Sequence, residues 1–305
     1  MSENIYDVII VGAGPAGLTA GIYTTRRALK TLVVGAELGG QISKTVLIEN
    51  YPGIKTTGGL GLAYQMQEQL KSFGAEIITD QATSLKLQDK IWQLTLSNGQ
   101  NYFAKTIILA FGLKKRKLGL ANEEKFDGRG LSYCVNCDGP LFKDKNVVVV
   151  GGGNSGADAV EFLAKICPQV YWLEVTDKFR ADERTQEKIK QLKNVTLWPK
   201  TKLTNLAGTD FLASVTAEKD GQLQELNVSG VFVEIGYQAE TSWLKELINL
   251  DELGQIKIDN LGHTNQAGIF AAGDVTNSKY KQIVVAEGAG AIAALEVYDY
   301  VQKNF

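Results

Sequence analysis

A glycine-rich loop of the form Gly-x-Gly-x-x-Gly occurs twice in this chain, each time between a strand pattern and a helical pattern. The first copy, Gly12-Ala-Gly14-Pro-Ala-Gly17, follows the apolar run 6–11, and the second, Gly151-Gly-Gly153-Asn-Ser-Gly156, follows the four valines 147–150. In such a loop the first glycine permits a tight turn, the second lets a pyrophosphate approach the backbone, and the third lets helix and strand pack closely. Two copies with the same flanks predict two nucleotide sites.

The C-terminal segment shows a similar order of a strand, a glycine turn and a helix. The stretch Ile269-Phe-Ala-Ala-Gly273-Asp274 reads as a buried strand that ends in Gly-Asp, and residues 286–300 read as a long helix. A carboxylate just past a strand can hydrogen-bond a polyol such as the ribityl chain of a flavin, although Gly-Asp alone is an ordinary turn signal. The position of this motif suggests that the first domain is discontinuous, interrupted by the second and completed by the C-terminal segment.

Composition limits the possible classes. A chain of 305 residues with 44% hydrophobic and 22% charged residues suits two soluble globular domains. A net charge of −2 gives no reason to expect nucleic acid or an anionic membrane as a partner. Apolar runs are shorter than a membrane span, and residues 1–7 show no signal-peptide pattern. Because three cysteines leave one unpaired, we expect a reducing, cytoplasmic location.

A Cys-x-x-Cys motif, Cys134-Val-Asn-Cys137-Asp138, lies between the two loops. Two cysteines at this spacing can form a disulfide, accept two electrons as a dithiol and pass them on by thiolate attack on another disulfide. A zinc site would need two more ligands, and only the isolated Cys167 and His263 remain. We therefore expect no metal site, and favour redox use over a pair of buried core thiols.

These residues resemble the low-molecular-weight thioredoxin reductase family along nearly the whole chain. Further landmarks are Gly39-Gly40-Gln41, Glu49-Asn50-Tyr51-Pro52-Gly53, and Lys281-Gln282 after Gly273-Asp274. Within the family, Cys137-Asp-Gly-Pro-Leu-Phe142, Trp172-Leu-Glu174 and Tyr280-Lys-Gln-Ile283 most resemble the reductase portion of the alkyl hydroperoxide reductase flavoprotein. That flavoprotein carries an N-terminal thioredoxin-like module, which we expect a separate protein to supply here.

The resemblance implies an α/β fold of two Rossmann-like three-layer domains, the second inserted in the first. An FAD-binding domain would comprise residues 1–114 and 248–305, and a pyridine-nucleotide-binding domain carrying the dithiol would comprise residues 115–247. The resemblance also implies a homodimer, and a rotation between domains at crossings near 112–119 and 238–244, since one flavin face cannot hold both nicotinamide and disulfide.

The implied chemistry is electron transfer from a nicotinamide to FAD, then to the Cys134–Cys137 disulfide, then to a thioredoxin- or glutaredoxin-like protein, with a peroxiredoxin as a further recipient. By resemblance, Cys137 is the thiol nearer the flavin and Cys134 attacks the partner. Asp138 is placed to protonate a departing thiolate, provided that partial burial favours its protonated form. The alternative for Asp138 is a helix N-cap.

The loops and the resemblance together assign the cofactor contacts. Residues expected on FAD are Gly12, Gly14, Gly17, Glu37, Gln41, Asn50, Gly273, Asp274, Lys281, Gln282 and Ile283. Residues expected on the pyridine nucleotide are Gly151, Gly153, Asn154, Ser155, Gly156, Glu174 and Arg180.

Nucleotide preference is read at the strand that follows the second loop. NADPH-using relatives carry His-Arg-Arg there and another arginine four residues on, whereas this chain has Glu174-Val-Thr and only Arg180. Glu174 stands at the spacing of an acceptor for the ribose 2′-hydroxyl. Two like charges near 4 Å cost about 4 kcal/mol at an intermediate dielectric, so a carboxylate there would disfavour a 2′-phosphate. We predict NADH over NADPH.

Two other functions remain open. Loss of the His-Arg-Arg cluster is also a mark of ferredoxin-linked thioredoxin reductases that do not use pyridine nucleotide, although the intact Gly151, Gly153 and Gly156 argue against that reading. A flavin-bearing redox sensor, in which the dithiol switches conformation without turnover, is the alternative from a different class.

Overall fold

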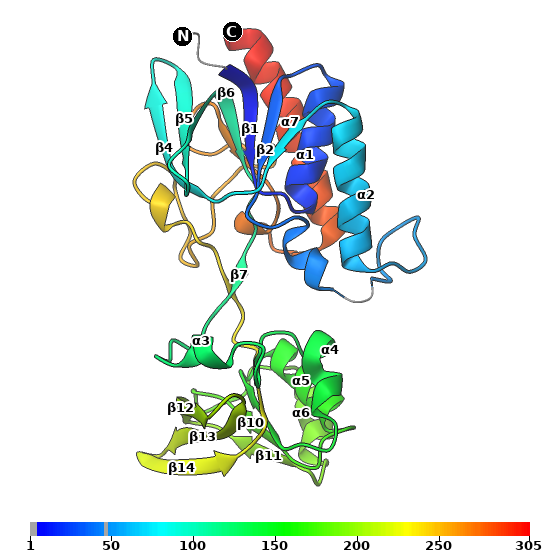
Figure 1. Ribbon diagram of the computed structural model, residues 1–305, viewed down its shortest axis with the longest axis vertical. Coiled ribbons are helices and arrows are strands. Elements are labelled where there is room, and N and C mark those ends of the chain that lie inside the picture. The colour runs from blue at the N-terminus through cyan, green and yellow to red at the C-terminus, as the bar shows by residue number, and fades with distance from the viewer. Residues whose placement is uncertain (1–4, 46–47) are drawn as a thin grey trace. The chain divides into compact units, whose positions relative to one another are not determined.

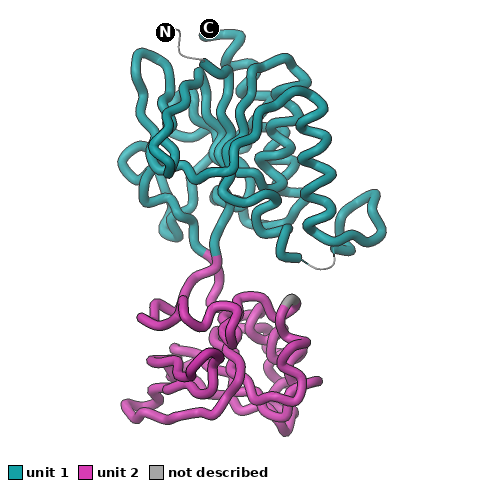
Figure 2. Tube along the Cα trace, viewed as in Figure 1, with its two compact units in different colours: residues 1–114, 238–305 teal, residues 115–237 magenta. Residues whose placement is uncertain are grey.

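The chain folds into two compact units, the second inserted in the first. The computed structural model describes residues 5–45 and 48–305, apart from the side chain of Cys137. Unit 1 comprises residues 1–114 and 238–305, and unit 2 comprises residues 115–237 (Figure 2). Each is an α/β unit with a parallel sheet, so the predicted fold class, two Rossmann-like units with an insertion, is confirmed.

Unit 1 is built on a seven-stranded sheet. Its elements are β1 (Ile5–Val11), α1 (Pro15–Arg26), β2 (Thr31–Val34), η1 (Gly40–Lys44), α2 (Gly59–Ser72), β3 (Glu76–Ile78), β4 (Ala82–Gln88), β5 (Ile91–Leu96), β6 (Asn101–Leu109), η3 (Ser242–Leu244), β17 (Ile269–Ala271), η4 (Gly273–Val275) and α7 (Ile283–Asn304). The order is β3-β2-β1-β6-β5-β4, and β17 also pairs with β6. Strands β3, β2, β1, β6 and β17 are parallel, whereas β4 and β5 form an antiparallel extension.

The sheet of unit 1 is covered on both faces. Helices α1, α2 and α7 lie together on one face (Figure 1), where Ile10 and Val33 point into the core. Ile9 and Leu32 point to the opposite face and pack with Trp92 of β5. Because both faces are buried, β1 and β2 are apolar almost without alternation, as is usual in parallel sheets.

Unit 2 has the same layered plan. Its elements are α3 (Glu123–Phe126), β8 (Leu131–Ser132), α4 (Val135–Asp138), η2 (Gly139–Phe142), β9 (Val147–Val150), α5 (Asn154–Leu163), β10 (Val170–Leu173), α6 (Glu183–Lys190), β11 (Val195–Trp198), β12 (Thr201–Gly208), β13 (Leu212–Lys219), β14 (Gln222–Asn227) and β15 (Gly230–Val233). The parallel sheet has the order β11-β10-β9-β15-β8, and a separate antiparallel sheet has the order β12-β13-β14.

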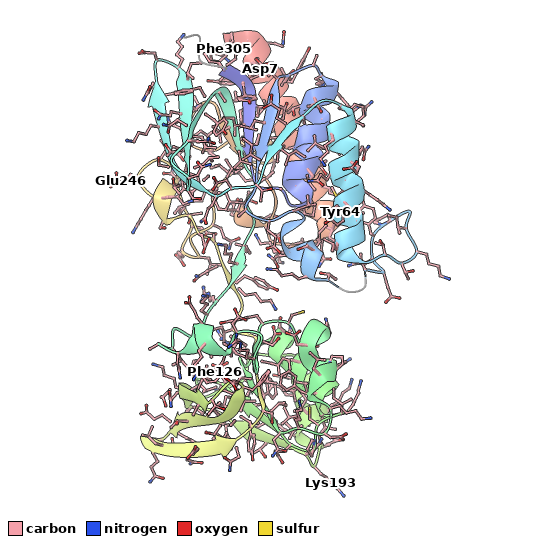
Figure 3. All side chains as sticks on the ribbon, viewed as in Figure 1. Asp7, Tyr64, Phe126, Lys193, Glu246 and Phe305 are labelled. Carbon is pink, nitrogen blue, oxygen red and sulfur yellow. The ribbon has the colours of Figure 1, made fainter. Side chains whose placement is uncertain are left out.

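The core of unit 2 lies on both sides of its parallel sheet. Val147 and Val149 of β9 pack with helix α5, whereas Val148 and Val150 pack with β12 and β13. Figure 3 shows the side chains that fill these layers, among them Phe126, which is 1% exposed. The valines of β9 therefore pack into the hydrophobic clusters on both faces of the sheet.

The second unit boundary differs from the one expected from sequence. We expected the inserted domain to end at 247, but the compact units divide between residues 237 and 238. The reason is burial: Leu244 of η3 is fully buried in the core of unit 1, and Trp243 packs with Phe111 at a ring-centroid distance of 5.8 Å. The chain passes between units as the short paired strands β7 (Lys114–Lys115) and β16 (Tyr237–Gln238).

None of the helices in the described ranges is both long enough and apolar enough to cross a membrane.

The turn from β1 into α1 depends on a close backbone contact. A Cβ on Gly17 would lie 1.8 Å from the carbonyl oxygen of Gly12, and a Cβ on Gly290 of α7 would lie 2.2 Å from that of Ala16. Both distances are far inside van der Waals contact, so helix α1 reaches the sheet and α7 only because glycines stand at these crossings.

We expect Gly17→Ala to destabilise the protein by about 3 kcal/mol, because the new methyl group overlaps backbone that cannot move aside. The matched control is Gly61→Ala in α2, where a Cβ would lie 4.0 Å from its nearest neighbour, and where alanine should stabilise the helix by about 0.5–1 kcal/mol. Urea unfolding measures both. Equal stability of Gly17→Ala and wild type would contradict this account of the turn.

Candidate functional site

The first glycine loop forms a backbone cradle at the N-terminus of α1. Gly12 has φ +126°, and a Cβ there would lie 2.2 Å from the Ala110 carbonyl oxygen. Gly14, by contrast, faces open space: only the Gly39 carbonyl lies within 4 Å, at 3.8 Å. No acidic residue stands in the first turn of α1, so the positive end of the helix dipole is unopposed. This geometry suits an anionic group at Gly14.

The Gly273-Asp274 turn meets the same loop. Gly273 has φ +76°, and a Cβ on it would lie 2.8 Å from the Ala16 side chain and 3.6 Å from that of Ala286. The turn that carries Asp274 is thereby held against the start of α1 and the start of α7. The structure thus brings together two motifs that are some 260 positions apart in the sequence, at the shared edge of β1, β6 and β17.

The carboxyl group of Asp274 is poorly solvated. Burial raises its pKa, and the nearby ammonium of Lys281 opposes that shift only in part. Lys281 Nζ donates to Gln255 Oε1 at 2.7 Å, to the Asp274 carbonyl at 2.9 Å and to the Thr276 carbonyl at 2.7 Å. Lys281 was expected on the cofactor; in the structure its ammonium braces the turn that presents Asp274.

The other residues expected around the first site are distributed between its edge and the surface. Asn50 Nδ2 donates to Gln282 Oε1 at 3.1 Å, which joins the loop before α2 to the N-cap of α7, next to Ile283. Gln41 Nε2 donates to the Leu113 carbonyl at 3.0 Å. Glu37 follows β2 and is exposed, with a 3.2 Å ion pair to Lys44.

One buried acceptor in unit 1 lacks a donor. Oε1 of Glu287, in the second turn of α7, is buried without a hydrogen-bond partner in the described part of the chain. Burial raises the pKa of this carboxyl, and a hydrogen bond from Tyr51 counteracts the rise. Unsatisfied buried acceptors are rare in folded proteins. The atom is therefore available to a donor on a bound ligand.

The second glycine loop repeats the geometry of the first. Gly151 has φ +122°, and a Cβ there would lie 2.2 Å from the Glu234 carbonyl; a Cβ on Gly156 would lie 1.9 Å from the Gly151 carbonyl. Gly153 again has nothing within 4 Å. Asn154 and Ser155 are exposed in the first turn of α5, and Asn154 Oδ1 accepts from the Asp182 N–H at 2.8 Å.

Glu174 clamps this second loop. Its side chain is 2% exposed; Oε2 accepts from the Gly152 N–H at 2.6 Å, and Oε1 accepts from the N–H and the hydroxyl of Thr176, both at 2.9 Å. We expected this carboxylate on a ribose hydroxyl. Because three protein donors already bind this carboxylate, its main effects are to fix a negative charge beside the second loop and to hold the loop rigid.

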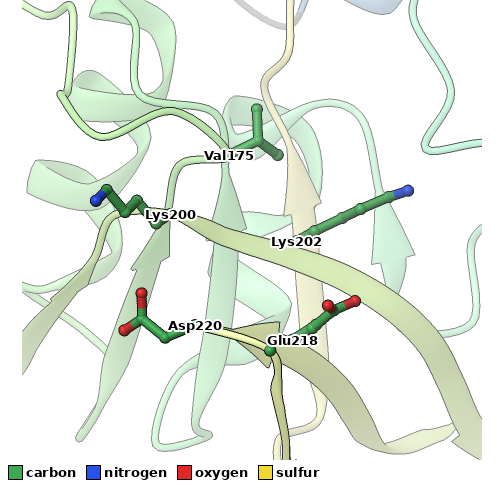
Figure 4. A pocket seen from close by; sticks show the side chains of 6 residues that line it. Val175, Lys200, Lys202, Glu218 and Asp220 are labelled. Atoms are coloured by element: carbon green, nitrogen blue, oxygen red, sulfur yellow. The ribbon is translucent and has the colours of Figure 1, made fainter.

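The surface beside Glu174 carries mixed charge. Arg180 Nη2 lies 3.9 Å from Glu174 Oε2, and its side chain is 73% exposed. Val175 is exposed and lines a shallow pocket with Lys200 and Lys202 of β12 and with acidic side chains of β13 and the turn after it (Figure 4). The lysines face an equal number of carboxylates there, so the pocket has no net charge.

The Cys-x-x-Cys motif lies on α4, directly after the edge strand β8. Cys134 is disulfide-bonded, while the side chain of Cys137 lies outside the described residues, so its position toward a flavin stays a prediction. Asp138 is partly buried and stands at the N-cap position of η2, but its side chain makes no capping hydrogen bond. Its Oδ2 instead accepts from the Ser132 hydroxyl at 2.6 Å.

Cys167 is a structural thiol, as its setting indicates. It is 4% exposed, its Sγ donates to the Phe142 carbonyl at 3.2 Å, and burial raises the pKa of the thiol to about 11. Within the described ranges, no cluster of three or more His, Cys, Asp or Glu side chains is arranged to hold a metal ion.

Sequence reasoning missed three residues of these sites. Ser132 and Thr176 each stand two positions from a residue that was recognised, Cys134 and Glu174, and a search for short polar side chains at that distance would have found them. Glu287 had no such signal, because a glutamate in a helix is usually exposed.

Comparison with known proteins identifies the class. The model of the pyridine nucleotide-disulphide oxidoreductase family matches residues 6–290, so the chain belongs to that family. The family implies FAD and a pyridine nucleotide as cofactors. The open cradles at Gly14 and Gly153 fit two such nucleotides.

Individual relatives narrow the class further. The F component of alkyl hydroperoxide reductase from Staphylococcus aureus is 41% identical over 306 residues, which cover 99% of this chain and 60% of that protein. The chain thus spans 60% of the length of the curated relatives it matches. Thioredoxin reductase of Lactococcus lactis, in its FR conformation, has a TM-score of 0.82 and 34% identity, covering 98% of this chain and 99% of that one. T. acidophilum thioredoxin reductase has a TM-score of 0.78 and 32% identity, covering 97% of this chain and 99% of that one.

We expect Gly153→Ala and Gly14→Ala to separate the two cofactors without unfolding the protein. Each methyl group would occupy space that the protein leaves open, so stability should change by less than about 0.5 kcal/mol. Gly153→Ala should weaken pyridine nucleotide binding at least about tenfold, or about 1.4 kcal/mol, and leave FAD bound. Gly14→Ala should instead weaken FAD binding and leave pyridine nucleotide binding unchanged. Calorimetric titration and flavin retention on dialysis measure the two; the opposite pattern would reverse the assignment.

The raised pKa of Glu287 predicts a pH-dependent loss of stability. The folded protein holds this proton more tightly than the unfolded chain, so the contribution is present below the ordinary glutamate pKa and is lost as pH rises through the folded-state value. Glu287→Gln lacks that loss. Its advantage in melting temperature over wild type should therefore grow from pH 5 to pH 8 in flavin-free protein. Glu246→Gln, the same substitution at an exposed position (Figure 3), is the control for the chemical change itself; a flat profile for Glu287→Gln would refute the assignment.

Proposed function

We propose that this protein is an FAD-dependent disulfide reductase that uses NADH and passes electrons through the Cys134/Cys137 dithiol to a thioredoxin- or glutaredoxin-like protein, with a peroxiredoxin further downstream. The observation that carries this proposal is the disulfide at Cys134, next to Asp138 in a unit whose Gly153 leaves its backbone open to a nucleotide. We assign FAD to unit 1, the pyridine nucleotide to unit 2, and a homodimer to the assembly.

FAD, when bound, would supply the two-electron carrier between nicotinamide and disulfide. In unit 1, Gly14 and the N-terminus of α1 would hold a phosphate, and Asp274 would accept from a ribityl hydroxyl. In unit 2, the open backbone at Gly153 and the N-terminus of α5 would hold the second pyrophosphate.

The thiol chemistry is an ordinary exchange. The thiolate of Cys134 attacks a sulfur of the partner disulfide, forms a mixed disulfide and releases one partner thiolate. Cys137 then attacks the sulfur of Cys134, which restores the internal disulfide and releases the second partner thiol. Asp138 exchanges the proton that a departing sulfur needs. Cys167 takes no part, because its thiol is buried and holds its proton.

Stopped-flow reduction with NADH, NADPH and reduced ferredoxin, side by side, tests this function. We expect NADH to bleach the flavin and a dithiol partner to reoxidise it. Cys134→Ser should keep flavin bleaching but reduce disulfide transfer to background, whereas Cys167→Ser should leave both intact. Bleaching by ferredoxin alone would identify the ferredoxin-linked alternative, and bleaching without transfer to any dithiol partner would identify a sensor.

The preference for NADH rests on charge at the edge of the second loop. The fixed carboxylate of Glu174 stands there, with the exposed Arg180 guanidinium 3.9 Å away. Because Val175 is exposed, Val175→Arg can place a guanidinium beside the ribose without disturbing the core. A charge-assisted hydrogen bond is worth roughly 1.5–3 kcal/mol, so kcat/KM for NADPH should rise about tenfold or more. Val175→Leu is the matched control and should change neither nucleotide; better use of NADPH than of NADH by wild type would overturn the preference.

A further inference from the structure

A buried hydroxyl connects the dithiol loop to its acid. Ser132 ends the edge strand β8, where it pairs in register with Phe232 of β15, and it is only 3% exposed. Its Oγ accepts from the Cys134 N–H at 3.0 Å and donates to Asp138 Oδ2 at 2.6 Å. The second of these bonds is short, as expected for a hydroxyl that donates to a carboxylate.

The three residues form a closed ring of hydrogen bonds. Ser132 Oγ holds the Cys134 N–H, the Cys134 carbonyl accepts from the Asp138 N–H at 3.0 Å, and the Asp138 carboxyl returns to Ser132. The backbone of the interchange cysteine and the side chain of the acid are therefore fixed to one buried point on the sheet. The helix α4 that separates them is a single turn, and alone it would not hold a carboxyl in a defined plane.

We propose that Ser132 is a positioning residue for proton transfer by Asp138. By holding Oδ2, the hydroxyl fixes the plane of the carboxyl group and leaves Oδ1 as the oxygen that carries the proton. This inference rests on the proposed reductase function and deepens it: the reaction needs the acid in one orientation, and a serine that touches neither substrate nor cofactor provides it.

The step balances in atoms and electrons. When the internal disulfide is reduced with an electron pair that began on the nicotinamide, the S–S bond breaks. The bonding pair stays on the departing sulfur, and the incoming pair stays on the other sulfur, which becomes a thiolate. The departing sulfur takes the proton from Asp138 Oδ1. The negative charge left on the carboxylate is stabilised by the O–H of Ser132, which already points at Oδ2. When the disulfide forms again during transfer to the partner, the same proton returns.

Ser132 serves both protonation states because a hydroxyl has one donor and two acceptor positions. Against the carboxylate it donates to Oδ2. With the proton on Oδ1 it donates to Oδ2 in the same way, and the Cys134 carbonyl, 3.3 Å away, is a longer second acceptor for the same hydroxyl. The bond from the Cys134 N–H is kept in either case, so the loop is not rebuilt during turnover.

The test is a double-mutant cycle on the FAD-loaded protein, with Ser132→Ala, Asp138→Asn and the double variant. We expect Asp138→Asn to lower kcat for a dithiol partner about a hundredfold. Ser132→Ala should lower kcat about tenfold or more and leave the KM for the partner unchanged. If Ser132 acts through Asp138, adding Ser132→Ala to Asp138→Asn should cost little more.

A matched control is available in the same unit. Ser214 is 8% exposed and donates to Glu225 Oε1 at 2.7 Å, so Ser214→Ala removes a similar serine–carboxylate bond far along the chain from the dithiol. Ser214→Ala should match Ser132→Ala in melting temperature but keep wild-type kcat. Ser132→Thr, which retains the hydroxyl, should restore at least half of the lost rate.

The outcomes separate this inference from the function on which it rests. Multiplicative losses in the cycle, or a raised KM at unchanged kcat, would overturn the positioning role of Ser132 while the reductase function stands. Wild-type protein that transfers no electrons through Cys134 to any dithiol partner would instead refute the function itself.

Discussion

A single backbone contact, made once in each unit, determines the geometry of both glycine loops. In unit 1 the Cα of Gly17 lies against the carbonyl of Gly12, and in unit 2 Gly156 lies against Gly151 in the same way. The contact sets where each first helix begins and turns its N-terminus toward the loop. In unit 1 it also places Ala16 where the Asp274 turn and α7 can pack.

Four carboxyl groups at the candidate sites differ in whether protein donors already satisfy them. Asp274 and Glu287 in unit 1 are buried with raised pKa values, and Glu287 has an acceptor without a donor in the described chain. Glu174 and Asp138 in unit 2 accept hydrogen bonds from protein donors that are already in place. If the FAD proposed for unit 1 donates to Asp274 and Glu287, its binding should stabilise that unit. The two carboxyl groups of unit 2 are already organised by the protein.

What the sequence predicted well depends on spacing along the chain. The two loops, the Gly273-Asp274 turn and the Cys-x-x-Cys motif are local patterns whose backbone consequences follow from residue type. One domain boundary needed correction, because residues 238–247 join unit 1, where Leu244 is buried. Two side-chain contacts were not foreseen: Glu174 accepts from the Gly152 N–H, and Lys281 donates to backbone carbonyl groups, while the contacts of both with a cofactor stay predictions. The hydrophobic periodicity of a sequence does not predict the hydrogen-bond partner of a side chain, nor which core a short segment packs against.

Insertion of one unit in the other has a consequence for biosynthesis. Helix α7 contributes Gly290 to the crossing at Ala16, and its N-cap Gln282 bonds Asn50; it is synthesised after unit 2. A ribosome will have released all of unit 2 before the partner helix of α1 exists, and domains tend to fold as their chains emerge. The inserted unit can therefore fold while α1 still lacks its contact with α7, and part of the apolar core of unit 1 stays exposed for chaperones to cover.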